Sequence, residues 1–347
     1  MKKVDIKSKN LEQLAAFIED VGQPRYRAEQ IFRWLHTENV PDFDSMTNIP
    51  LSVRRILDEN SYINSLKIKK KLASRVDDTV KYLYEAMDGQ TLETVMMPQP
   101  YGASLCISTQ VGCRMGCRFC ASTIAGLERN LSAGEMLDQI YTTGHNSSVK
   151  IGSVVLMGIG EPLDNFEETV KFFEILNSRL GKGMSLRHVS LSTCGLVDKI
   201  RLLSEKKLGV TLSVSLHSPN DEIRSRIMPI NKRWPVDELL SACKDYFKAT
   251  GRRVSFEYSL IRGLNDGAIH AKELAQKLKH LNCHVNLIPL NSVAESGFER
   301  STKETVETFK KTLEKSGVTT TIRRERGSDI NAACGQLRRQ IAPEITP

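Results

Sequence analysis

The sequence predicts an α/β protein with a small helical module at its N-terminus. From Ser104 onward, apolar strand patterns alternate with amphipathic helix patterns, which is typical of a parallel α/β sheet or barrel. Residues 1–60 show helical periodicity, and residues 61–100 show the alternation of short antiparallel strands. We therefore expect a helical N-terminal domain, a β-rich linker extension and a main α/β domain that covers residues 101–347.

The N-terminal module is expected to contain three helices. The first follows Ser8 and Asn10 and has an apolar face at Leu11, Leu14, Phe17 and Ile18. A second is expected from Tyr26 and a third over residues 52–59. Lysine and arginine are interspersed throughout this module. It is therefore either an RNA-docking domain or a packing appendage, and we favour RNA contact.

The remaining elements follow from the alternation of patterns along the chain. In the extension, strands are expected over 67–71, 79–84 and 92–96, with Asp88-Gly89 as the turn between the last two. In the main domain, strands are expected over 104–109, 153–157, 187–192, 210–216, 253–259, 284–289 and near 318–323. The helices between them are expected over 133–145, 166–180, 198–207, 236–250, 268–280 and 302–316.

Composition limits the class of protein. The chain has 347 residues, enough for one large barrel and a small domain. No apolar run is long enough to cross a bilayer, and the N-terminus lacks the apolar stretch of a signal peptide, so we expect a cytoplasmic protein without membrane contact. The net charge of +8 favours a polyanionic partner, although an inert basic surface is the alternative.

Three cysteines form the most informative motif. Cys113, Cys117 and Cys120 have C-x3-C-x2-C spacing, so three thiolates within eight residues can hold one metal centre. Zinc sites usually need four ligands, and a ferredoxin-type run would supply a fourth cysteine nearby, which this stretch lacks. The spacing indicates a [4Fe-4S] cluster with one iron open to a substrate or cofactor. Buried or zinc-bound cysteines are the alternative.

Glycines and polar residues follow several expected strands. Gly158-Ile159-Gly160-Glu161-Pro162 comes after an apolar strand, where glycine lets a ligand approach the backbone closely. The carboxyl ends of parallel strands meet on one face, which makes other residues at such ends candidate ligand contacts. These candidates are Ser192, Ser215, Leu216, His217 and Asn291. Each of them could instead be a turn residue or a helix N-cap.

Two further cysteines stand apart from the motif. Cys106 lies on the first expected strand of the main domain, seven residues before Cys113. Cys334 lies in a segment, 327–337, that begins with one glycine and holds another at Gly335, which suggests a mobile loop suited to a thiol that visits more than one position. Either cysteine alone would more often be a small buried hydrophobe. We interpret three others as structural: Cys194, Cys243 and Cys283.

The cysteine spacing resembles that of radical S-adenosylmethionine (SAM) enzymes. The resemblance implies that SAM binds the open iron and is split by an electron to give a 5′-deoxyadenosyl radical. It also implies that the main domain is a partial (β/α)6 barrel. The stretch with Gly160 and Glu161 resembles the motif that binds the SAM amino group, so the polar strand ends become candidate contacts to the rest of SAM.

The whole set of motifs resembles the RlmN family, the bacterial RNA adenine C2 methyltransferases with dual specificity for 23S rRNA and tRNA. Asn331 departs from it, since the family often has aspartate there. The motifs that carry the resemblance are Ser108-Thr109-Gln110-Val111-Gly112-Cys113, Phe119-Cys120-Ala121-Ser122-Thr123, Arg129-Asn130-Leu131, Gly158-Ile159-Gly160-Glu161-Pro162, Arg226-Ile227-Met228-Pro229-Ile230-Asn231 and Ala332-Ala333-Cys334-Gly335-Gln336-Leu337.

The resemblance implies a mechanism that uses two SAM molecules per turnover. The first methylates Cys334, and the second yields the radical that takes hydrogen from the S-methyl group. The carbon then bonds to adenine C2, and Cys106 releases the product by forming a disulfide with Cys334. Glu93 matches the family's proposed general base. The implied substrates are adenines near the peptidyl-transferase centre of 23S rRNA and beside the tRNA anticodon.

The resemblance further implies an electron donor such as flavodoxin or ferredoxin, and we expect a monomer. Two alternatives remain open on the sequence. One is an adenine C8 methyltransferase of the antibiotic-resistance type, which shares every cysteine named above. The other is a non-catalytic RNA-binding protein with an iron–sulfur or zinc site, which would need neither Cys106 nor Cys334.

Overall fold

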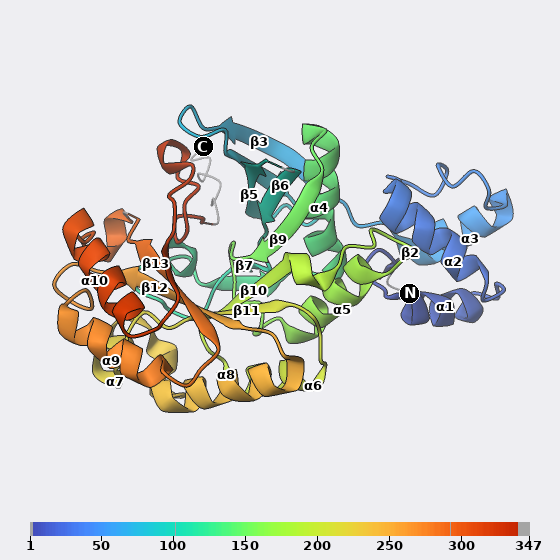
Figure 1. The fold of residues 1–347 in the computed structure, drawn as a ribbon. Helices are drawn as coiled ribbons and strands as arrows, with labels where there is room; N and C mark the ends of the chain where they lie inside the picture. The colour runs from blue at the N-terminus through green and yellow to red at the C-terminus, as the bar shows by residue number, and fades with distance from the viewer. Residues whose placement is uncertain (1–2, 101, 292, 339–347) are drawn as a thin grey trace.

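A ten-stranded sheet forms the centre of the computed structural model, which describes residues 3–100, 102–291 and 293–338. Its strand order is β14-β13-β12-β11-β10-β9-β6-β5-β4-β3 (Figure 1). The strands are β3 (Lys67–Ala73), β4 (Val80–Glu85), β5 (Thr91–Gln99), β6 (Gly102–Cys106), β9 (Ile151–Leu156), β10 (Val189–Thr193), β11 (Thr211–Ser215), β12 (Val254–Leu260), β13 (Cys283–Pro289) and β14 (Thr320–Ile322).

Within this sheet, seven neighbouring strands run parallel and alternate with helices; they are β6, β9, β10, β11, β12, β13 and β14. The pairings of the described residues leave β14 and β3 at the two ends of the sheet, so the barrel is open, as the sequence predicts. The helices are α4 (Ala133–Ser147), α5 (Phe166–Asn177), α6 (Val197–Glu205), α7 (Asp221–Ile227), α8 (Val236–Thr250), α9 (Ala268–Leu278) and α10 (Lys303–Lys315).

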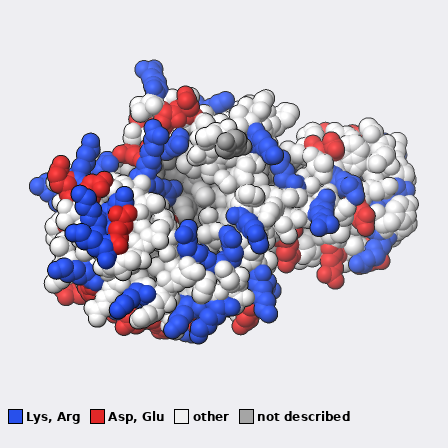
Figure 2. Space-filling model, in the orientation of Figure 1, with Lys and Arg blue, Asp and Glu red and all other residues white. Residues whose placement is uncertain are grey.

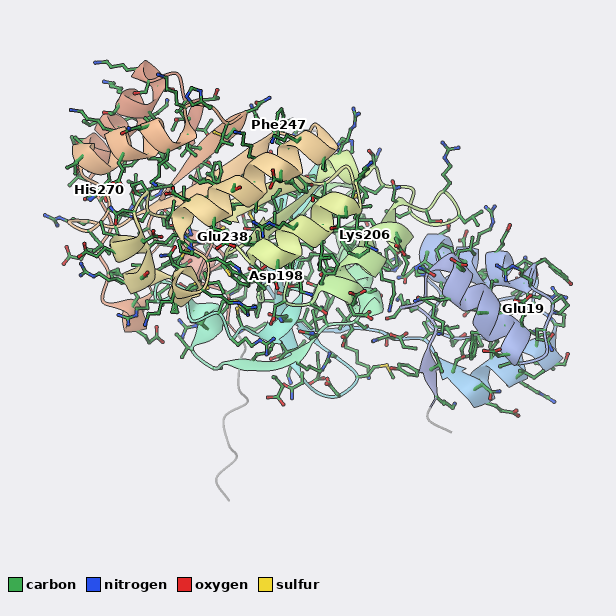
Figure 3. The ribbon with its side chains drawn as sticks, turned by 90° about the horizontal axis from the view of Figure 1, so that it is seen from below. Glu19, Asp198, Lys206, Glu238, Phe247 and His270 are labelled. Atoms are coloured by element: carbon green, nitrogen blue, oxygen red, sulfur yellow. The ribbon has the colours of Figure 1, made fainter. Side chains whose placement is uncertain are left out.

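The helices cover the outer face of the parallel strands and leave the inner face for a site. Seen from below, Asp198 and Lys206 at the ends of α6 lie beside α8, which carries Glu238 and Phe247 (Figure 3). Helix α8 shows why the layer forms: one face buries apolar residues against the sheet, while its C-terminus stops at Gly251 in a left-handed conformation. The chemistry must therefore lie on the opposite, inner side of the sheet.

The antiparallel strands β3 to β5 continue the same sheet beyond β6. Asp88 and Gly89 lie in the turn between β4 and β5, as expected. Val95 of β5 pairs with Cys106 of β6, so β5 lies directly beside the first strand of the barrel. The residues expected as a β-rich extension thus form one edge of the central sheet.

The N-terminal module contains the three expected helices, α1 (Leu11–Asp20), α2 (Arg27–Arg33) and α3 (Leu51–Asn60). Asn10 and Gln13 form a capping box at the start of α1. A π-helical turn (Trp34–Glu38) follows α2, and two short parallel strands, β1 (Val4–Asp5) and β2 (Ser61–Tyr62), close the module. The sequence did not predict these strands, because two residues are too few to show periodicity.

Helix α4 joins the module to the barrel. Lys7 forms a buried ion pair with Asp138, whose second oxygen accepts the Leu66 amide at 2.5 Å. Nδ1 of His36 lies 3.2 Å from the Tyr141 hydroxyl, and burial lowers the pKa of His36 to about 3, so the ring is neutral. These buried contacts dock the module on the barrel.

One expected strand is shorter than predicted. Strand β6 ends at Cys106 instead of continuing to residue 109. The chain turns, and β7 (Gln110–Gly112) pairs with β8 (Leu127–Asn130) in a separate two-stranded sheet. Among the helices of the described residues, none has the length and apolar character that crossing a bilayer requires.

Candidate active site

The loop between β7 and β8 carries the three motif cysteines. Cys113, Cys117 and Cys120 all line one cavity on the inner face of the sheet, which we call the main cavity because it holds these three thiols. Gly112 starts the loop with φ +79°, and a Cβ at this position would lie 1.9 Å from the Gly126 carbonyl oxygen. Because only glycine fits there, the close crossing of β7 and β8 fixes where the loop begins.

The three thiols suit a cluster better than a single ion. Burial raises the pKa of Cys113 to about 12, and burial together with the neighbouring thiols raises that of Cys117. A metal centre must therefore displace protons from these thiols when it binds. In the part of the chain that is described, no three His, Cys, Asp or Glu side chains gather closely enough to hold one metal ion. A cubane fits because each cysteine would bind a different iron around the cavity.

The glycine motif after β9 lies against the same cavity. A Cβ at Gly158 would lie 2.6 Å from the Ile107 carbonyl oxygen, and one at Gly160 would lie 2.6 Å from Cβ of Gln110. The buried Glu161 carboxylate accepts backbone N–H groups of Leu163 at 3.0 Å and Cys194 at 2.7 Å. These bonds tie the turn after β9 to the turn after β10, so Glu161 shapes the cavity that it helps to line.

Most of the predicted strand-end residues converge on this cavity. Its lining includes Gly160, Glu161, Ser192, Ser215, His217 and Asn291. Leu216 is fully buried in the core, and its carbonyl accepts Nε of the buried Arg224 at 3.0 Å. The side chain of Leu216 is therefore not placed in the cavity, although its neighbours are.

His217 has a defined protonation state. Its Nδ1 accepts the Ser259 amide at 2.9 Å, and its ring meets the Phe119 ring edge-on at 4.8 Å. Burial lowers the pKa of His217 to about 3, so the ring is neutral. Since Nδ1 accepts a hydrogen bond, Nε2 carries the proton and can act as a donor.

The segment that carries Cys334 is tethered to the cysteine loop. Nδ2 of Asn291 donates to the Cys334 carbonyl at 2.9 Å. The Ala121 amide donates to the Gly335 carbonyl at 2.8 Å, and Oγ of Ser122 donates to the carbonyl of Leu337 at 2.7 Å. The segment 327–337, expected as a mobile loop, is thus held against the cavity on this side.

A second set of bonds holds the other end of the Cys334 loop to the turn between β3 and β4. The Gly327 amide donates to Asp77 at 2.9 Å, and Ser74 donates to Asp329 at 2.7 Å. Asn331 has φ +50°, a left-handed conformation that asparagine tolerates as aspartate does. The departure from the family's aspartate at this position is therefore compatible with the loop backbone.

Cys334 and Cys106 lie close enough to influence each other. Cys106 is buried in an apolar cluster with Val95 of β5 and Ala332 of the loop. Burial raises the pKa of Cys106 to about 12, and the nearby Cys334 contributes to the rise. Of these two thiols, Cys334 lines the main cavity and Cys106 does not, so they differ in access: Cys334 faces the cavity, and Cys106 lies behind it.

Arg323 lies near Cys334 and Cys106 and also near Glu257 on strand β12 of the barrel. The Cys334 sulfur, to which Arg323 donates a hydrogen bond, is the main cause of the raised pKa of this arginine, and Glu257 adds to the rise. Nη1 of Arg323 lies 3.8 Å from Glu257 and 3.5 Å from the sulfur of Met157. The Arg323 side chain is 24% exposed, and its guanidinium is a cation hydrogen-bonded to the Cys334 sulfur.

Glu93 does not share the main cavity with the cysteines. Its carboxylate is buried, with Oε1 3.0 Å from Nζ of Lys81 and Oε2 accepting the Arg338 amide at 3.1 Å. It lines a second cavity, to which the Cys334 loop also contributes residues. Leu290 borders both cavities, so the two lie next to each other.

Comparisons with known proteins place this site in a family. Residues 107–275 match the model of the radical SAM superfamily, and residues 4–63 match that of the ribosomal RNA large subunit methyltransferase N-terminal domain. A probable dual-specificity RNA methyltransferase RlmN of Alkaliphilus oremlandii is 48% identical over 98% of this chain and 99% of its own length. The chain belongs to the RlmN family.

Other matches agree with this assignment. The RlmN of Thermoanaerobacter sp. is also 48% identical, over 98% of this chain and 99% of its own length. The crystal structure of a radical SAM methyltransferase from Sphaerobacter thermophilus superimposes with a TM-score of 0.91 at 41% identity, covering 96% of this chain and 99% of that one. The RlmN resemblance and the open barrel predicted from the sequence are confirmed, and superfamily membership implies a [4Fe-4S] cluster and SAM as cofactors.

Sequence reasoning missed several residues of this RlmN site. Glu257 lies on the buried strand β12, where an acidic residue inside an apolar pattern is itself a signal. Arg323 follows β14, and Cys194, interpreted as structural, lines the main cavity next to Glu161. Nothing in the sequence marks Lys81 as a site residue, because a lysine on an alternating strand usually points to solvent.

Proposed function

We propose that this protein methylates C2 of adenine in 23S rRNA and in tRNA. Its family membership makes it a radical SAM RNA methyltransferase; the carbon attacked and the order of steps are our proposal. The observation that supports it best is the pair Cys334 and Cys106, one thiol at the cavity and the other buried behind it. A non-catalytic iron–sulfur protein would have no use for this pair.

The cofactor side of the site is formed by two sets of residues. Cys113, Cys117 and Cys120 would hold the cluster, and the turn with Gly160 and the strand ends around it would hold SAM. The bound cluster and SAM would together supply a 5′-deoxyadenosyl radical, which is needed because adenine C2 is not a nucleophile. We propose two SAM molecules per turnover, since the methyl carrier must be loaded before the radical forms.

Cys334 would carry the methyl group. Its thiolate attacks the methyl carbon of the first SAM, so an S–CH3 bond forms at Cys334 while S-adenosylhomocysteine leaves. The Arg323 guanidinium is hydrogen-bonded to the sulfur that attacks. The S-methyl group later loses a hydrogen atom, and its carbon forms a bond to adenine C2. RNA is then covalently attached to the protein through the Cys334 sulfur.

Cys106 would release the product. Its thiolate attacks the Cys334 sulfur, so an S–S bond forms while the bond from that sulfur to the transferred carbon breaks. The electron pair stays with the carbon, which takes up a proton and becomes a methyl group. The adduct that the radical forms holds an unpaired electron, so one electron and the proton on C2 must both leave before this step. The electron would pass to the oxidised cluster, and Glu93 is our candidate for the base that removes the proton.

RNA binding is supported by the surface around the site. Figure 2 shows a hollow on this face with Lys and Arg atoms around its rim. The chain also carries a net charge of +8, and an excess of Lys and Arg attracts phosphate groups. We propose that the N-terminal module adds RNA contacts, that flavodoxin or ferredoxin supplies electrons, and that the protein acts as a cytoplasmic monomer.

The proposed reaction can be tested directly. Anaerobic reconstitution with iron, sulfide, SAM, dithionite and RNA is expected to yield 2-methyladenosine, measured by mass spectrometry of the digested nucleosides. Formation of 8-methyladenosine instead would assign the reaction to the C8 class. If SAM is not cleaved and no methylated nucleoside forms, the catalytic proposal is wrong.

The role of Arg323 gives a second expectation. Replacing Arg323 with methionine should slow the S-methylation of Cys334, because the Cys334 sulfur loses the cation that is hydrogen-bonded to it. Removal of one charged hydrogen bond of this kind typically costs about 1.5–3 kcal/mol, or roughly a 10- to 150-fold lower rate. Peptide mass spectrometry over time measures it, and Arg323→Lys should recover part of the rate. Equal S-methylation in Arg323→Met and parent protein would contradict this role.

A further inference from the structure

Lys81 is a buried lysine on β4, where the surface strand pattern predicts an exposed one. Its side chain is 8% exposed, and Nζ lies 3.0 Å from Oε1 of Glu93 on the neighbouring strand. The same Nζ donates to the Asn331 carbonyl of the Cys334 loop at 3.1 Å. A buried ammonium is costly unless it is paired, so this position is maintained by the carboxylate and the carbonyl together.

Glu93 is bonded to the Cys334 loop on both sides of the cysteine. Through Lys81 it reaches Asn331, which precedes Cys334, and directly through Oε2 it accepts the amide of Arg338, which follows it. The carboxylate therefore sits at the centre of a bridge between β4, β5 and the loop. Each of its two oxygens contacts a different donor: Oε1 contacts Lys81, and Oε2 contacts the Arg338 amide.

The strand register places this bridge on the face of the sheet that bears Cys106. Lys81 pairs with Val95 of β5, and Val95 pairs with Cys106 of β6, so the three side chains form a row across the sheet. Glu93 lies two residues from Val95 and so points to the same face. The loop residues Ala332 and Leu337 pack on this row in the apolar cluster around Cys106.

We propose that Lys81 is a positioning residue that locks the Glu93 carboxylate to the Cys334 loop. This inference rests on the proposed function, in which Glu93 accepts the proton from adenine C2. Lys81 sets where that carboxylate lies relative to Cys334 and Cys106, and it compensates the charge of the carboxylate in a buried setting. It touches neither SAM nor the cluster thiols, since it lines the second cavity and not the main one.

The proposal separates two steps of the reaction. The loop keeps its other bonds when Lys81 is changed, including those from Asn291 to Cys334 and from Ala121 to Gly335. S-methylation of Cys334 should therefore continue in Lys81→Met. Proton removal from C2 should slow by about 100-fold, the lower end of what a positioned base contributes. The RNA adduct should then persist on the protein although Cys106 is present.

The experiment compares four reconstituted full-length proteins: parent, Lys81→Met, Lys81→Arg and Lys70→Met. Lys70 is exposed on neighbouring β3, so Lys70→Met removes the same charge without touching Glu93 and should behave as the parent. Peptide mass spectrometry reports S-methylation, and a denaturing gel with labelled RNA reports the adduct. We expect only Lys81→Met to accumulate adduct with S-methylation intact, and Lys81→Arg to recover turnover.

Two results of the activity assays would overturn the proposal. The first is normal turnover of Lys81→Met. The second is a loss of S-methylation equal to the loss of product, which would show that Lys81 supports the fold as a whole and not the proton-removal step. Hydrogen exchange on RNA-free protein gives a readout independent of the reaction: the Arg338 amide should exchange faster in Lys81→Met but not in Lys70→Met. If the parent makes no methyladenosine but the Arg338 amide exchanges faster in Lys81→Met, the proposed function is wrong and the positioning role of Lys81 is still supported. If the exchange rate of the Arg338 amide is the same in Lys81→Met as in the parent, Lys81 does not hold Glu93 to the Cys334 loop.

Discussion

Replacing Cys106 with alanine is expected to trap RNA on the protein as a covalent adduct. Transfer of the carbon from Cys334 joins protein and RNA before anything can release them, and release needs a thiol that reaches the Cys334 sulfur. Cys106 is buried beside that sulfur, in contact with Ala332 of the loop. Because alanine fills most of the same small apolar space, the earlier steps should proceed and the adduct should accumulate.

The matched control is Cys334→Ala, which should give neither adduct nor product, because nothing carries the methyl group. A denaturing gel with labelled RNA distinguishes the two variants. Cys283→Ala, which changes a half-buried thiol on β13 that does not line the main cavity, should behave as the parent. Normal turnover of Cys106→Ala, or adduct in the double variant of Cys106 and Cys334, would show that the roles are assigned wrongly.

The sequence was sufficient for features that are local in the chain. The spacing of Cys113, Cys117 and Cys120 predicted that three thiols hold one metal centre, and all three line one cavity. The alternation of strands and helices predicted a parallel α/β sheet or barrel, and the family resemblance implied that the barrel is partial. Both signals depend only on neighbours in the sequence. The convergence of strand ends was predictable for the same reason, since parallel strands in sequential order bring their carboxyl ends to one face.

What the sequence could not predict are contacts between distant segments. The turn after β3 holds the Cys334 loop through Asp77 and Ser74, which lie 250 and 255 residues from their partners in the loop. The sequence pattern predicts that Lys81 is exposed, whereas in the structure its side chain donates a hydrogen bond to Asn331 of the Cys334 loop. Strand β6 ends early because Gly112 and Gly126 pack β7 against β8, a contact that no periodic pattern shows.

The order of burial also explains why two similar cysteines receive different roles. Sequence spacing alone treats Cys106 and Cys334 alike, as single thiols far from each other. The structure gives Arg323 and the cavity to Cys334 but surrounds Cys106 with apolar side chains, which raise its pKa to about 12. A thiol that stays protonated will not compete for the methyl group of SAM, and Cys106 must lose its proton before it attacks the Cys334 sulfur in the later step.

Replacing Cys117 with alanine is expected to abolish the cluster and, with it, SAM cleavage and RNA methylation. The parent should bind about four irons and four sulfides per chain after anaerobic reconstitution, whereas two cysteines cannot retain a cubane. Burial and the other thiols raise the pKa of Cys117, so assembly must displace protons and should improve as the pH rises. The fold should survive, because within residues 3–100, 102–291 and 293–338 no hydrogen bond or ion pair of the Cys117 side chain joins two strands of the sheet.

Cys243→Ala is the matched control for the cluster. This thiol is fully buried on α8, away from the main cavity, and burial likewise raises its pKa, to about 12. Its loss should leave the iron and sulfide content unchanged, which separates the effect of losing a cluster ligand from that of losing any buried cysteine. Zinc at one per chain without sulfide in the parent, or a full cluster in Cys117→Ala, would show that the three thiols do not hold a cubane.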